Sequence, residues 1–183
     1  MLARMGRILS LSAVITGALG LTSCRALDRT LAREPTSTPD PLQILDTVRR
    51  EVIPAEGSPT AYGPRFTSEG YEILREWNGG IHPEPAWADD YERLDIQLPC
   101  CGATYPFKDE TKNCGCGHHQ AMYGLAKRLL RNGTHPTAVQ DEIIRWRAYL
   151  FPRETLEAEL ERRSLGDPAM RQALDELRRQ GVC

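Results

Sequence analysis

The apolar residues of this chain recur mainly three or four positions apart, the spacing of a helix with one buried face. Residues 41–52, 68–78, 119–131 and 137–150 show this repeat, which predicts four amphipathic helices. Segments rich in glycine, proline and polar residues separate them and read as turns or loops. A short turn between the last two of these helices predicts that they lie antiparallel to each other.

The C-terminal part of the chain predicts two further helices. One begins at Pro152, and the other has Asp167 as its cap and Pro168 as its first residue. Only residues 95–98 alternate polar and apolar positions as a strand does, and this segment is too short to imply a sheet. We therefore expect a mainly α protein, a small helical domain.

The N-terminus has the pattern of an export signal. Arg4 and Arg7 precede an apolar run over residues 8–21, which is too short for a comfortable membrane span. The run ends in Leu-Thr-Ser-Cys, which resembles a bacterial lipobox. That resemblance implies cleavage before Cys24 and attachment of lipid to its thiol. The alternative is an uncleaved signal anchor with an incidental cysteine.

These observations divide the chain into four parts. Residues 1–23 are a lipoprotein signal peptide, and residues 24–41, rich in Pro and Thr, are the lipid anchor and a flexible tether. Residues 42–152 form a Cys/His-rich helical domain, and residues 153–183 form a C-terminal helical extension. The expected location is extracytoplasmic, on the periplasmic or cell-surface face of a membrane. A formal net charge of −2 without a basic run argues against a nucleic-acid partner.

Potential metal ligands are concentrated in one short stretch, residues 99–119. It holds four of the six cysteines and two of the four histidines. The candidate ligands are Cys100, Cys101, Cys114, Cys116, His118 and His119. Thiolate and imidazole are the ligands that best suit copper and zinc, although the paired Cys-x2-Cys hooks of a zinc finger are absent. Because neighbouring helical residues point about 100° apart, we expect only one histidine to face the cysteines.

The same cysteines also allow a purely structural interpretation. Cys100 and Cys101 are adjacent, so a disulfide between them would be strained, and each would find a partner across the loop more easily. Two such disulfides would staple a small exported domain. Apart from Cys24, five cysteines remain, so at least one, such as Cys183, does not pair within the chain.

Cys114-Gly-Cys-Gly-His-His, followed by a helix, a glycine turn and a second helix, resembles the second half of bacterial lipoproteins with a Pro-Cys-Tyr-Cys-Gly-Cys motif. Pro99-Cys100-Cys101-Gly102 would be a contracted form of their first cluster, without its third cysteine. The resemblance covers about residues 65–152 and implies metal binding, with copper favoured. A weaker similarity links the helix-glycine-helix layout to the thiol-reducing subunit of cytochrome c maturation, whose Cys-Pro-x-Cys pair is absent here.

Motifs of hydrolases, zinc proteases, phosphate loops and dinucleotide sites are absent, so these enzyme classes lack support. Three hypotheses follow. The first is a lipid-anchored protein that holds copper or zinc for storage, delivery or sensing. The second is a thiol–disulfide partner that keeps an extracytoplasmic cysteine pair or copper site reduced. The third is a disulfide-stapled subunit of a membrane complex. We favour the first, with the membrane and a protein that receives metal or electrons as partners.

Overall fold

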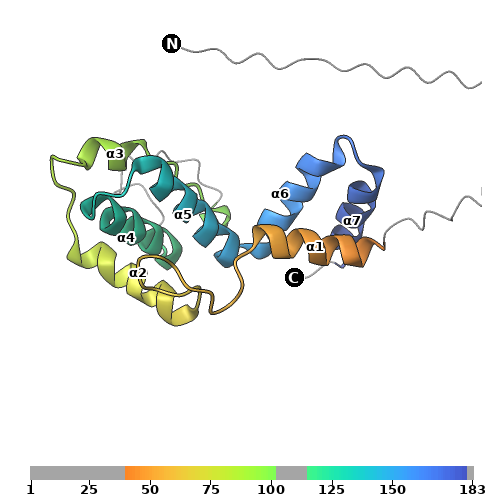
Figure 1. The fold of residues 1–183 in the computed structure, drawn as a ribbon, viewed down its shortest axis with the longest axis horizontal. Coiled ribbons are helices and arrows are strands. Elements are labelled where there is room, and N and C mark those ends of the chain that lie inside the picture. Colours follow the sequence, from red (N-terminus) through yellow and green to blue (C-terminus); the bar gives the residue numbers. More distant parts are fainter. Residues whose placement is uncertain (1–39, 102–114, 181–183) are drawn as a thin grey trace, which may run out of the picture. The chain divides into compact units, whose positions relative to one another are not determined.

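The computed structural model describes residues 40–101 and 115–180, and within them it contains helices and no strand (Figure 1). The helices are α1 (Pro41–Val52), α2 (Ser68–Gly80), α3 (Ala88–Arg93), the 3-10 helix η1 (Pro99–Cys101), α4 (Gly117–Arg131), α5 (Pro136–Leu150), α6 (Pro152–Ser164) and α7 (Pro168–Arg179). The mainly α prediction is confirmed. The predicted signal peptide, Cys24 and nearly all of the tether lie outside the described residues.

Local capping chemistry explains why the helices begin where they do. The side chain of Thr67 accepts a hydrogen bond from the backbone of Gly70, and Asp167 accepts one from the backbone of Ala169. His135, which precedes α5, accepts one from the backbone of Thr137. These bonds satisfy backbone N–H groups that have no partner within their own helices.

Close packing of α2 against α4 organises the larger of two hydrophobic clusters (Figure 1). A β-carbon at Gly124 of α4 would overlap the backbone of Leu74 in α2, so only glycine allows this approach. Behind the pair, Trp146 of α5 is fully buried against Phe66, with ring centroids 4.7 Å apart. The start of α4 is thereby fixed relative to α2.

The segment between α3 and η1 is extended and alternates buried with exposed residues. Leu94, Ile96 and Leu98 are buried, as the polar–apolar alternation predicts, but the segment joins no sheet. Gln140 of α5 makes two hydrogen bonds to the backbone of Asp95, at 2.8 and 2.9 Å. The Gln140 amide thus holds the strand-like segment that leads to the first cysteines.

The second hydrophobic cluster joins α1 to α6 and α7 (Figure 1). Val48, Leu160 and Ala173 are its fully buried members. The pattern of residues 41–52 predicts one buried face, and this face of α1 packs against the C-terminal helices α6 and α7. The domain boundary after residue 152 stays a prediction.

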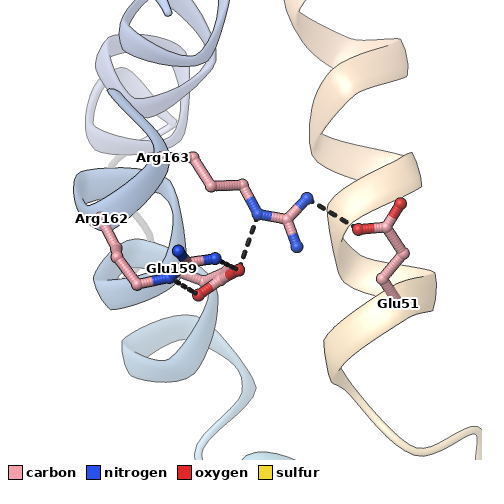
Figure 2. A network of polar contacts seen from close by, with 4 residues as sticks. All are labelled: Glu51, Glu159, Arg162 and Arg163. Carbon is pink, nitrogen blue, oxygen red and sulfur yellow. Dashed lines mark hydrogen bonds and ion pairs between the residues drawn. The ribbon is translucent and has the colours of Figure 1, made fainter. Parts of the chain in front are cut away.

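A polar network reinforces the contact between α1 and α6 (Figure 2). Arg163 donates to Glu159 on its own helix and to Glu51 on α1, both at 2.7 Å. Arg162 makes two further hydrogen bonds to Glu159. The hydrogen bonds from Arg162, together with the one from Arg163, lower the pKa of Glu159 to about 2.

Candidate metal centre

Two glycines shape the backbone around Cys116, which caps the N-terminus of α4. Gly115 has a φ of +61°, in the left-handed region that glycine adopts without strain. A β-carbon at Gly117 would overlap the Tyr71 hydroxyl and would lie 3.2 Å from Nε of Arg75. The Gly-Cys-Gly sequence thus lets the chain turn into α4 while it lies directly against α2.

Three predicted ligands meet at this point. Ligand atoms of Cys100, Cys116 and His118 all lie within 4.8 Å of one another. The two sulfur atoms are 3.7 Å apart. Two sulfurs bound to a tetrahedral zinc, each about 2.3 Å from it, would be about 3.8 Å apart. These three side chains therefore have a spacing that can hold a metal ion.

His119 also approaches the centre, from the next position of α4. Its Nδ1 lies 3.3 Å from Sγ of Cys116, although it is not part of the mutual group of three. Burial, with a contribution from neighbouring His118, lowers the pKa of His119, which favours the neutral ring. Both histidines thus approach Cys116, whereas we expected one. The reason is that a capping residue is contacted by side chains from more than one position of the first helical turn.

The environment of Cys100 differs from that of an ordinary surface cysteine. The residue is exposed, but its sulfur faces Cys116. Burial of the sulfur, with the hydrogen bond and charge interaction with Cys116, raises the pKa of Cys100 to about 11. The thiol of Cys100 is therefore protonated at neutral pH without a metal, and a bound ion would have to displace this proton.

A cleft of about 380 Å³ adjoins the centre on the side of His118. Tyr71 and His118 line it, with ring centroids 5.7 Å apart, and so do Tyr149 and Glu56. The Tyr149 hydroxyl donates to Glu56 at 2.6 Å. Burial and this hydrogen bond raise the pKa of Tyr149 to about 12. Small molecules can therefore approach one flank of the metal-ligand group.

The other predicted ligands, together with Cys183 and the histidine of the loop after α2, are placed as follows. The backbone of Cys101 continues η1 directly after Cys100. Cys114 and Cys183 lie outside the described residues, so their predicted roles stay predictions. His82 is exposed in the loop after α2 and takes no part in the group of three.

Sequence reasoning missed the part that α2 plays in this centre. Tyr71 belongs to the helix predicted over residues 68–78, and its ring lies beside His118 and its hydroxyl beside Gly117. Nε of Arg75, one turn further along, is buried next to Gly117 without a hydrogen-bond partner. No local signal identifies these two residues, because their role depends on the packing of α2 against α4.

Comparison with models of known protein families, with curated proteins and with solved structures found no match. Among the helices formed by residues 40–101 and 115–180, none has the length and apolar character needed to cross a bilayer. The assignment of function therefore depends on the geometry of the centre and on the sequence pattern around it.

Proposed function

We propose that this protein is an extracytoplasmic, lipid-anchored metal-binding protein that holds copper or zinc. One observation carries the proposal: the ligand atoms of Cys100, Cys116 and His118 lie within 4.8 Å of one another although the two cysteines are 16 residues apart. Side chains from two separate elements, η1 and α4, thus meet at one point. Local chain geometry alone does not produce such a meeting.

The chemistry of the three side chains narrows the choice of ion. Two thiolates and an imidazole favour Cu(I) or Zn(II) over calcium or magnesium, which prefer oxygen ligands. The two thiolates neutralise the charge of Zn(II), and they leave one net negative charge with Cu(I). The positive end of the α4 dipole lies next to Cys116 and favours such an anionic ligand set.

The three-residue group leaves room in the coordination sphere. A structural zinc takes four protein ligands, whereas a site that exchanges its ion or binds a further group keeps one position open. Cys101, Cys114 and His119 are the predicted candidates for the remaining position. The cleft beside His118 gives a partner or small ligand access to the ion, which favours storage, delivery or sensing over a purely structural role.

The anchoring half of the proposal comes from the sequence pattern. The short apolar run that ends at Cys24 supports export and lipid attachment. The Pro- and Thr-rich tether would keep the metal centre near the membrane surface, where a membrane-bound partner can reach it. Copper is favoured by the resemblance to cysteine-rich lipoproteins.

The experiment is elemental analysis of the full chain, purified in detergent from cells supplied with copper and zinc. We expect about one ion per chain, retained through gel filtration. Cys116→Ser and His118→Ala should each lower this stoichiometry strongly. His82→Ala is the matched control, because His82 is an exposed histidine outside the group.

Spectroscopy on the cobalt-substituted protein identifies the ligands directly. Cobalt bound by thiolate gives ligand-to-metal charge-transfer absorption, which should weaken in Cys100→Ser and disappear in the Cys100→Ser/Cys116→Ser double variant. Metal content that is unchanged in all three ligand variants would contradict the proposed centre. A metal-free protein with readily exchanging thiols would favour the thiol–disulfide alternative, and cysteines that resist reduction would favour the stapled subunit.

A further inference from the structure

We propose that Cys100 and Cys116 also undergo thiol–disulfide exchange, and that the disulfide formed between them releases the bound ion. This inference rests on the proposed function, because it concerns the regulation of the same centre. Its oxidant is a small-molecule or protein disulfide. The site would then hold its ion under reducing conditions and release it when disulfides predominate.

The position of the two sulfur atoms supports this step. They are 3.7 Å apart, and a disulfide bond needs about 2.05 Å. The remaining movement is small, and the two sides of the centre differ in how readily they can provide it. Cys116 is fixed at the start of the 15-residue helix α4, whereas Cys100 belongs to the three-residue helix η1. A shift of η1 toward α4 is therefore the simpler movement.

Exposure assigns the order of events. Cys100 is exposed, whereas Cys116 is only partly so, which means that an oxidant meets Cys100 first. The Cys100 sulfur, a thiolate while it binds the ion and otherwise after loss of its proton to solvent, attacks one sulfur of the oxidant RSSR, forms a mixed disulfide and expels one RS⁻. The thiolate of Cys116 then attacks the sulfur of Cys100 and expels the second RS⁻. In sum, the two cysteines are oxidised to one disulfide, and one RSSR is reduced to two RS⁻, which take up protons from solvent or from the cysteine thiols to become RSH.

Disulfide formation removes two of the three described ligands at once. Thiolate is the form of cysteine that binds a metal ion, and a disulfide sulfur carries no comparable charge. His118 would remain as a single imidazole ligand of the group. Loss of the ion should therefore follow the formation of the bond, with one ion released for each disulfide.

Cys100 could form a disulfide with its neighbour Cys101 or with Cys116, and the geometry favours Cys116. A Cys100–Cys101 disulfide joins adjacent residues and is strained. The structure instead places Cys100 at 3.7 Å from Cys116, across the intervening sequence. A Cys100–Cys116 bond is thus the expected product, and Cys101 should be dispensable for it.

The test uses the full chain in detergent, reduced, loaded with zinc and then treated with oxidised glutathione. Released zinc is followed with a coloured chelator, and disulfides are mapped by peptide mass spectrometry. We expect about one zinc per Cys100–Cys116 disulfide and recovery of binding after reduction. Cys101→Ser should form the same Cys100–Cys116 disulfide, and His82→Ala, which changes no candidate ligand, should release zinc like the unaltered chain. A zinc-free sample treated in the same way should form the same disulfide.

Several outcomes would overturn the inference. One is a zinc-loaded chain that keeps all of its zinc after oxidised glutathione has formed the Cys100–Cys116 disulfide. Another is a disulfide that joins a different pair of cysteines. In both cases the reduced protein still binds zinc, and the proposed function stands. If the reduced protein takes up no zinc, the proposed metal-binding function is wrong. The disulfide map of the zinc-free sample then still shows whether Cys100 and Cys116 undergo the exchange.

Discussion

Gly124→Ala tests whether the close approach of α2 and α4 requires a glycine at this position. A β-carbon at this position would lie 2.8 Å from the backbone nitrogen of Asn78 and 3.0 Å from the carbonyl carbon of Leu74, and closer still to its oxygen. Ordinary contacts of a β-carbon begin at 3.4 Å. All three atoms belong to the backbone of α2, so no side-chain rotation relieves the overlap, and the two helices must move apart.

The magnitude follows from two opposing terms. Overpacking of a tight core costs about 1–3 kcal/mol, and contact with rigid backbone puts this site at the upper end. Alanine in place of glycine within a helix returns up to about 1 kcal/mol. We therefore expect the free energy of unfolding to fall by about 2 kcal/mol in Gly124→Ala.

The assay is urea unfolding, followed by far-ultraviolet circular dichroism in the presence of a metal chelator. Gly79→Ala is the matched control, because it is also a helical glycine and a β-carbon there would have no neighbour within 4 Å. The control should be as stable as the unaltered chain, or slightly more stable. Equal stability of the two variants would refute the inference that helix–helix contact explains Gly124.

Two further predictions concern the network of Figure 2 and the segment before Cys100. The pKa of Glu159 falls from 4.5 to about 2 on folding, so its ion pairs stabilise the fold above the unfolded-state value and are lost as the pH falls toward 2. The free energy of unfolding, measured at a series of pH values, should show this loss. Glu159→Gln should lower the free energy of unfolding by about 1–2 kcal/mol at pH 7. Gln140→Ala removes both hydrogen bonds to Asp95 and should weaken zinc affinity several-fold in a chelator competition, with circular dichroism unchanged.

The helices could be predicted from the sequence because their signals are local. Residues 41–52 and 137–150 were predicted as helices, and α1 and α5 match them within a residue at each end. Asp167 fulfilled its predicted capping role because an aspartate needs only the next backbone N–H groups to do so. The six-residue helix α3 was not predicted, since so short an element carries too few apolar positions to show a period.

The sequence does not predict in the same way which elements each helix packs against. The apolar stripe of α1 indicates that one face is buried, but it does not say against which element. Gln140 shows a related limit, because its spacing fits a capping box while a backbone segment distant in the sequence offers it two hydrogen bonds. Both differences arise from long-range contacts, which a local pattern does not encode.

The candidate site shows the same division between local and long-range information. The sequence located Cys100, Cys116 and His118 by residue type alone, because thiols and imidazoles gather in one short stretch. It did not identify Tyr71, whose place beside His118 depends on how α2 packs on α4. Ligand chemistry was therefore predictable, whereas the wall of the adjoining cleft was not.

The centre joins a firmly held half to a weakly held half, and this asymmetry explains why an ion would matter to the fold. Cys116 and His118 belong to the start of α4, which Gly124 anchors to α2. Cys100 follows an extended segment that depends on three buried apolar side chains and on Gln140. An ion bound to both halves would tie Cys100 to the start of α4. Metal binding should therefore stabilise η1 more than α4, and protection of η1 amides from hydrogen exchange should rise most on loading.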